Sequence, residues 1–150
     1  MTIPTNLRTI AESLGGYTVF QREIASDLDL AREVEVGFPS ASLSFVLRDL
    51  GEAAVSQQAV YAVVGSARTL QRKRQRDTRL SRDESDRLAR LVRLIARAEE
   101  ALGSREKALR WVAKPNRALE GASPISLLAS DAGALAVERV LGRIEHGVFA

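Results

Sequence analysis

Apolar residues recur at three- and four-residue spacing along most of this 150-residue chain, which is the pattern of amphipathic helices. The clearest stretch covers residues 81–102, and its apolar face consists of Leu88, Leu91, Val92, Ile95, Ala98 and Leu102. Ser81 and Glu84 stand three positions apart, as in a capping box, and Gly103 marks the end of the helix. No run of residues sustains the alternation of a strand. The sequence therefore predicts an all-α fold.

Serine residues mark the starts of further helices, because a serine hydroxyl can accept a hydrogen bond from an N–H group of the first helical turn. We expect caps at Ser40, Ser56, Ser66, Ser104, Ser123 and either Ser130 or Asp131. These helices are expected to end near Gly51, Val64, Arg76, Lys114, Leu128 and Gly147, respectively. The predicted inner face of the last helix is made of Leu135, Val137, Val140, Leu141 and Ile144.

Positive charge is concentrated in one short window. The chain has a formal net charge of +3, yet residues 68–79 carry six cations against one acid, so this window contributes +5 and the remainder −2. The cations are Arg68, Arg72, Lys73, Arg74, Arg76 and Arg79. A local cationic segment is expected where a protein contacts the phosphate backbone of a nucleic acid. A solvated helix face is the alternative.

The same window belongs to a predicted helix-turn-helix. Two short helices, 56–64 and 67–76, are joined by Gly65-Ser66, and the second carries the charge. Leu70 is its apolar anchor. Side chains near the start of such a helix reach base edges in DNA, whereas later ones meet phosphates. We therefore predict base contacts by Arg68, Thr69, Gln71 and Arg72 and phosphate contacts by Lys73, Arg74 and Arg76.

A single copy would make only a few phosphate contacts and bind weakly at physiological salt, so we expect a dimer or a larger assembly. Its two recognition helices would stand about 34 Å apart, one turn of DNA.

The first 36 residues are weakly patterned. Gly15-Gly16 interrupts them, and we expect two short helices, around 6–14 and 20–35, in a segment that becomes ordered in a complex. Gly37-Phe38-Pro39 then interrupts the helical pattern. We divide the sequence into an N-terminal segment (1–36), a helix-turn-helix domain (37–80) and a small helical domain (81–150).

The composition argues against an enzyme. Cysteine is absent, and the single histidine, His146, stands at the end of the last helix, where a cation is favourable. Phosphate-binding loops and metal-ligand spacings are also missing, so we expect no catalytic residue, metal or cofactor. No apolar run approaches the roughly 18 residues of a membrane span, and the start lacks a signal-peptide pattern. We expect a cytoplasmic protein with no membrane contact.

The last forty residues resemble one family. Their ordered pieces are Trp111-Val112, Lys114-Pro115-Asn116-Arg117-Ala118-Leu119, Ser123-Pro124-Ile125, Asp131-Ala132-Gly133 and Arg143-Ile144-Glu145-His146-Gly147-Val148-Phe149. This order resembles the toxin-binding domain of the Xre/MbcA/ParS antitoxins, which in that family follows a helix-turn-helix domain. Residues 66–73 also resemble the family's recognition helix. One departure is Val64, at a position where the family commonly has glycine.

The resemblance implies a toxin partner with a RES domain, a fold that consumes NAD, whose NAD pocket is covered by the antitoxin's C-terminal region. An arginine there would take the place of the dinucleotide's pyrophosphate. Phe149, next to the free carboxylate, is an apolar side chain that a partner would bury. The implied toxin-binding residues are Arg117, Arg139, Arg143, Glu145, His146, Gly147, Val148, Phe149 and Ala150.

The resemblance thus predicts an antitoxin that inhibits its toxin and represses its own operon. One alternative is a stand-alone transcriptional regulator whose C-terminal domain only dimerises. Another is an interaction module whose basic helix contacts acidic protein surfaces instead of DNA.

Overall fold

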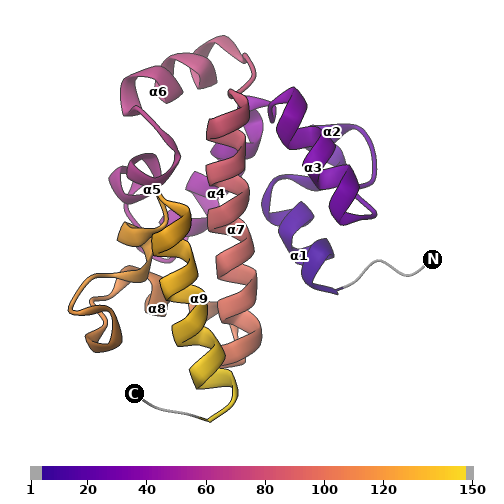
Figure 1. Ribbon diagram of the computed structural model, residues 1–150. Helices are drawn as coiled ribbons and strands as arrows, with labels where there is room; N and C mark the ends of the chain where they lie inside the picture. The colour runs from indigo at the N-terminus through magenta and orange to yellow at the C-terminus, as the bar shows by residue number, and fades with distance from the viewer. Residues whose placement is uncertain (1–4, 148–150) are drawn as a thin grey trace.

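The computed structural model describes residues 5–147, which form a bundle of helices (Figure 1). The α-helices are α1 (Thr5–Ser13), α2 (Gly16–Phe20), α3 (Asp27–Val36), α4 (Ser40–Glu52), α5 (Gln57–Val64), α6 (Ala67–Arg76), α7 (Arg82–Leu102), α8 (Arg105–Ala113) and α9 (Asp131–Glu145). Two 3₁₀ turns follow α8, η1 (Arg117–Leu119) and η2 (Pro124–Leu127). No strand occurs between residues 5 and 147, and the all-α prediction is confirmed. None of the helices in this range is long and apolar enough to cross a membrane.

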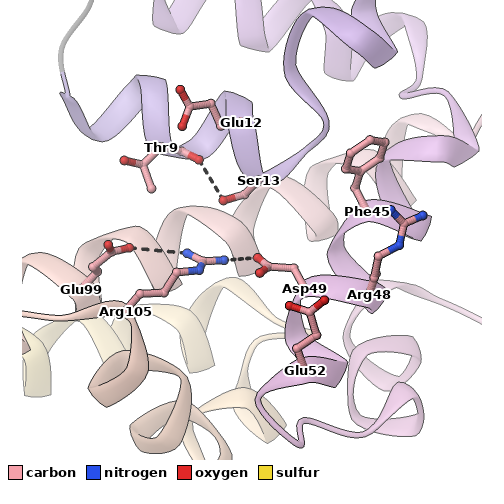
Figure 2. Close-up of a pocket in the computed structure, with 9 residues that line it drawn as sticks. All are labelled: Thr9, Glu12, Ser13, Phe45, Arg48, Asp49, Glu52, Glu99 and Arg105. Atoms are coloured by element: carbon pink, nitrogen blue, oxygen red, sulfur yellow. Dashed lines mark hydrogen bonds and ion pairs between the residues drawn. The ribbon is translucent and has the colours of Figure 1, made fainter.

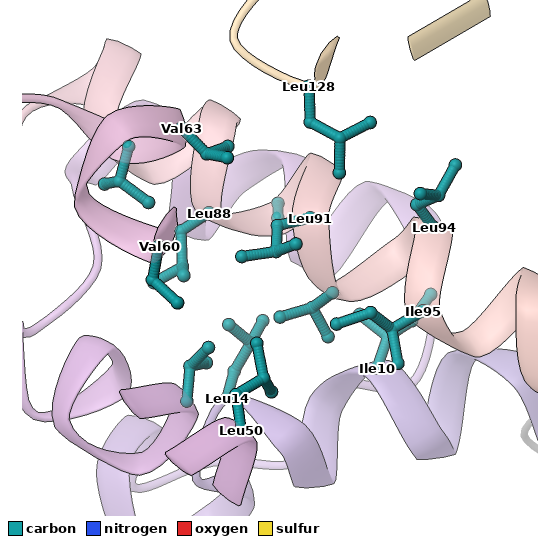
Figure 3. Close-up of a cluster of buried hydrophobic side chains, with 14 of the residues drawn as sticks. Ile10, Leu14, Leu50, Val60, Val63, Leu88, Leu91, Leu94, Ile95 and Leu128 are labelled. Carbon is teal, nitrogen blue, oxygen red and sulfur yellow. The ribbon is translucent and has the colours of Figure 1, made fainter. Parts of the chain in front are cut away.

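Helix α7 runs through the middle of the bundle (Figure 1). Helices α1 and α3 pack against it from the N-terminal part of the chain, and α5, α8 and α9 pack against it as well. Figure 3 shows α7 side chains gathered with side chains from α1, α4 and α5 in one buried cluster. The residues labelled there are Ile10, Leu14, Leu50, Val60, Val63, Leu88, Leu91, Leu94, Ile95 and Leu128.

The predicted ends of α7 are confirmed. The hydroxyl of Ser81 accepts a hydrogen bond from the N–H of Glu84, and the Glu84 carboxylate accepts one from the N–H of Ser81, which completes a capping box. Gly103 ends the helix in a left-handed conformation, with φ 89°.

The N-terminal helices belong to the same core, contrary to our expectation for this segment. Leu7, Ile10 and Leu14 are buried in the cluster around α7. Helix α1 corresponds to the predicted helix 6–14, whereas the predicted helix 20–35 begins only at Asp27, as α3, and the short helix α2 was not predicted. The later start has a local cause, because Ser26 caps α3 through the N–H of Asp29. Residues 5–36 are thus packed within the isolated chain and need no partner to form helices.

Four of the predicted serine caps are confirmed and two are not. Ser56, Ser66, Ser104 and Ser130 each accept a hydrogen bond from the N–H group three residues further on. Ser123 stands before η2 without a side-chain cap bond. Ser40 is wrong as a cap, because Pro39 holds that position and the Ser40 N–H is satisfied by the carbonyl of Thr78 at 3.2 Å.

Helix α4 ends at Glu52, one residue beyond the predicted Gly51. One predicted member of the inner face of α9 is wrong. The inner face of α9 passes through Ala134, Val137 and Leu141. Leu135 follows Ala134 and is rotated by about 100° around the helix axis, so its side chain is 46% exposed.

A close backbone contact joins the segments that precede α4 and α7. The N–H of Leu80 donates to the carbonyl of Phe38 at 2.8 Å, and Pro39 forms an isolated β-bridge with Arg79. Gly37 lies beside this contact with φ 96°, and a Cβ atom there would stand 2.2 Å from the Leu80 carbonyl oxygen. Both the backbone angle and the space therefore require glycine at position 37.

A partly buried ion pair joins α6 to α7. Glu84 is 8% exposed, and its Oε1 accepts hydrogen bonds from Lys73 Nζ at 2.5 Å and from the Ser81 N–H at 2.7 Å. Burial raises the pKa of the Glu84 carboxyl, but the bonds from Lys73 and Ser81 and the Lys73 charge outweigh it, and the net pKa lies below its ordinary value. The charged pair thus holds the end of one helix to the start of the other.

We predict that Gly37→Ala lowers the free energy of unfolding by more than about 3 kcal/mol, because it adds a backbone clash to an unfavourable φ. Gly103→Ala is the matched control, since its φ is 89° but a Cβ atom there meets nothing within 4 Å. That variant should lose only about 1 kcal/mol. Urea unfolding measures both, and equal losses would contradict the role given to the Leu80 contact.

We predict that Glu84→Gln lowers the free energy of unfolding by about 1.5 kcal/mol at neutral pH, because it leaves the partly exposed Lys73 without its counter-charge. Since the folded-state pKa of Glu84 is depressed, its contribution is fully present above the unfolded pKa and is lost as the pH falls through the folded pKa.

Urea unfolding of wild type and Glu84→Gln from about pH 7 to about pH 3 tests this, and the difference should shrink at the acid end. Glu106→Gln removes an exposed carboxylate that lies 3.8 Å from Arg110, and it should change stability by less than about 0.5 kcal/mol. A pH-independent difference for Glu84→Gln would refute the assigned pKa direction.

Candidate functional site

Helices α5 and α6 form the predicted helix-turn-helix. Ser66 caps α6 through the N–H of Thr69, and Leu70 is fully buried beneath it. The turn needs no left-handed residue, because Gly65 has φ 165°, an extended conformation open to any residue. Val64, where the resembling family commonly has glycine, ends α5 and is fully buried. The departure at Val64 is therefore compatible with this turn.

The outer side of α6 carries cations that the protein leaves unpaired. Arg68, Arg72 and Arg76 are exposed, and none of them has an ion-pair or hydrogen-bond partner in the described part of the chain. Gln71 is exposed beside them, and Thr69 is half-buried. Helix α6 contains no acid, and it lies across the end of the bundle at which α7 begins (Figure 1). This end of the molecule therefore presents a positively charged helix to its surroundings.

The other two predicted phosphate contacts face the protein instead. Lys73 forms the ion pair with Glu84. Arg74 donates through Nε to Ser44 Oγ at 3.0 Å and through a terminal guanidinium nitrogen to the Tyr61 hydroxyl at 2.9 Å. These bonds connect α6 with α4, α5 and α7, so Lys73 and Arg74 fix the direction in which the exposed arginines point.

Sequence reasoning missed the residues that orient α6. Ser44 and Tyr61 carried no local signal, because their partner, Arg74, belongs to another helix. Gln75 was missed as well, and with Ser44, Gln71 and Arg74 it lines a polar hollow along α6. Its exposure follows from its place one turn beyond Gln71, which is a signal that the sequence contained.

The predicted C-terminal site residues lie on α9 and on the loop before it. Arg139 and Arg143 are exposed on α9, and Arg117 is exposed in η1. His146 and Gly147, which follow α9, are also exposed, and Gly147 has φ 73°. Val148, Phe149 and Ala150 lie outside the described residues.

Among the predicted toxin-binding residues that the structure describes, Glu145 differs because its side chain has a partner within the chain. Its Oε2 accepts from a guanidinium nitrogen of Arg97 in α7 at 2.5 Å. Near the other end of α9, Arg90 of α7 pairs with Asp131 and donates to the Leu128 carbonyl at 3.2 Å. Helix α9 is thus attached to α7 at two points.

A hollow of about 470 Å³ is lined by side chains of α1, α4, α7 and α8, and Figure 2 shows this lining. Arg105 reaches across it to Asp49 and to Glu99, the latter at 3.5 Å. Glu12 and Glu52 add further negative charge to the wall. None of the predicted site residues lines this hollow, and its ion pairs connect α8 to α4 and α7. Among residues 5–147, no group of His, Cys, Asp and Glu side chains could hold a metal ion.

Two family models match the chain, one after the other. The antitoxin Xre-like helix-turn-helix domain matches residues 29–93, and the antitoxin Xre/MbcA/ParS C-terminal toxin-binding domain matches residues 97–147. The first match ends and the second begins within α7. The helix that supports both α6 and α9 is therefore shared between the two matched regions.

Three curated relatives carry the name Antitoxin Xre. The protein of Pseudomonas putida is 34% identical over 125 residues, which cover 83% of this chain and 76% of the relative. That of Yersinia enterocolitica is 43% identical over 55% of this chain and 57% of its own length. That of Photorhabdus laumondii is 43% identical over 44% of this chain and 45% of its own length. The matched chain thus spans less than two thirds of the latter two proteins.

The fold and the comparisons indicate the same family. The chain has a helix-turn-helix with exposed cations, a helical region follows it, and the match to the Pseudomonas protein covers most of both chains. The chain belongs to the family of Xre antitoxins.

Proposed function

We propose that this protein is a cytoplasmic antitoxin that inhibits a RES-domain, NAD-consuming toxin and represses its own operon by binding promoter DNA. The main observation in support is that α7 holds two separate exposed surfaces in place. One is the exposed side of α6, and the other is the α9 region within the matched toxin-binding domain. We propose that residues 37–80 bind DNA and that residues 81–150 bind the toxin.

The proposed DNA contacts follow from the exposure of the α6 side chains. Arg68, Thr69, Gln71 and Arg72 stand in the first two turns, where a recognition helix meets base edges. Arg76, at the far end, would contact a phosphate. Lys73 and Arg74 would orient the helix through their partners in the protein rather than neutralise phosphates. With so few phosphate contacts for each copy, tight binding would require a dimer or an oligomer that includes the toxin.

The proposed toxin contacts combine charge and position. Arg117, Arg139 and Arg143 are exposed without acidic partners among residues 5–147, so their guanidinium groups are available to anions. We propose that the region from Arg139 to Ala150 covers the NAD pocket of the toxin and that one arginine takes the place of the pyrophosphate. Glu145, held by Arg97, would keep the end of α9 in position for this contact.

A stand-alone regulator is the second candidate. The observation in its favour is the exposed Leu135, which a second copy of this chain would bury in a dimer. The two candidates differ in their genetic setting. An antitoxin requires a neighbouring gene for a RES-domain protein that is toxic when it is expressed alone, whereas a stand-alone regulator does not.

We predict that the double variant Arg72→Glu/Arg76→Glu weakens binding to the DNA upstream of its own gene by about 100-fold or more. It should also lower the slope of log K against log salt by about one unit, because the phosphate contact of Arg76 is lost. Capture of the toxin should be unaffected. Fluorescence anisotropy over a range of salt concentrations measures the first two effects, and a pull-down measures the third.

The matched control is Arg8→Glu/Arg93→Glu, which changes the net charge equally at two exposed positions on α1 and α7. If this control weakens DNA binding as strongly as the α6 variant does, the attraction depends on overall charge, and α6 is not the recognition helix.

We predict that a chain ending at Glu145 loses inhibition of the toxin's NAD consumption. The truncation keeps the whole of α9 and its ion pair with Arg97, so the shortened protein should melt within about 2 °C of wild type. Co-expression with the toxin, followed by pull-down and an NAD assay, compares the two chains. Full inhibition by the shortened chain would exclude a role for residues 146–150.

A further inference from the structure

Helix α9 contains two glycines, Gly133 and Gly142, and only the first is closely packed against another part of the chain. A Cβ atom at Gly133 would stand 1.9 Å from the carbonyl oxygen of Leu127, so the packing of η2 on α9 requires glycine there. A Cβ atom at Gly142 would meet nothing within 4 Å. Glycine inside a helix is destabilising relative to alanine, because it loses more conformational freedom on folding. The isolated chain therefore offers no structural reason for Gly142.

The neighbours of Gly142 on the helix surface are exposed. Arg139 and His146 lie one turn before and after it, and Leu135 lies two turns before it, so all four share one side of α9. Leu135 is 46% exposed, which leaves an apolar side chain at the N-terminal end of this side. We call the side formed by Leu135, Arg139, Gly142, Arg143 and His146 the outer face of α9.

The charge of the outer face indicates what covers it. Arg139 and Arg143 have no ion-pair partner within residues 5–147, and the outer face contains no acid, although Glu138 lies at its edge. Two copies of the face placed against each other would bring like charges together, which is unfavourable. A protein surface with acidic side chains would instead complement it.

We propose that the outer face of α9 is a docking surface for the toxin and that a segment of the toxin crosses it in direct contact with the backbone at Gly142. The absence of a Cβ atom lets another chain approach the helix axis closely. The toxin buries Leu135 and presents acidic side chains to Arg139 and Arg143. This inference rests on the proposed antitoxin function and adds to it the place of closest contact.

The test compares Gly142→Ala with Gly51→Ala. Gly51 also lies within a helix, in α4, and a Cβ atom there also meets nothing within 4 Å. Both substitutions should raise the melting temperature of the isolated protein by about 3 °C, because alanine favours the helix. Only Gly142→Ala should weaken toxin binding, by about tenfold or more. A variant can thus be more stable and yet bind its partner less tightly.

The binding probe is the RES-domain protein encoded beside this chain, carrying a substitution that abolishes its NAD consumption, and calorimetry measures the Kd. Leu135→Ala is a second variant, expected to weaken binding about fivefold without a change in melting temperature, because the side chain is exposed in the isolated protein.

The outcomes separate this inference from the proposed function. If the wild-type chain does not bind the toxin, the antitoxin proposal itself fails. If wild type binds and both Gly142→Ala and Leu135→Ala bind equally well, the outer face is not the docking surface. If the variants instead disrupt self-association in sedimentation experiments and leave the toxin affinity unchanged, a second copy of this chain covers the face and the inference is overturned.

Discussion

The burial of α7 between the helices that precede it and those that follow it is the constraint on which the rest of this structure depends. Its apolar side chains fill the core, and its polar side chains attach the two candidate binding elements. Lys73 and Glu84 join α6 to the start of α7, and Arg97 and Glu145 join the end of α9 to its later turns. We propose that a toxin bound at α9 influences DNA binding through this shared helix.

Local signals in the sequence predicted the helices but not how they pack. The capping box of Ser81 and Glu84 and the glycine at position 103 depend only on neighbouring residues, and α7 has the predicted ends. The N-terminal helices were underestimated because Leu7 and Ile10 belong to the core around α7, which begins more than seventy residues further along the chain. Ser40 was misjudged for a related reason, since a carbonyl from residue 78 satisfies its N–H group.

The same limit applies to the candidate site. Counting cations located the charged helix, but only the fold distinguishes Arg68, Arg72 and Arg76 from Lys73 and Arg74, because the partners of the latter two belong to other helices. The fold also distinguishes the two glycines of α9, which look equivalent in the sequence. Exposure and contacts across the bundle therefore decide which of the expected residues are available to a partner.

The central claim is that DNA and toxin occupy different surfaces supported by one helix. Hydrogen–deuterium exchange of the full chain, alone, with upstream duplex DNA and with the inactive toxin, tests it directly. The account predicts that DNA slows exchange in residues 66–76 and that the toxin slows exchange in residues 131–147. If DNA and the toxin protect the same segment most strongly, the claim is contradicted.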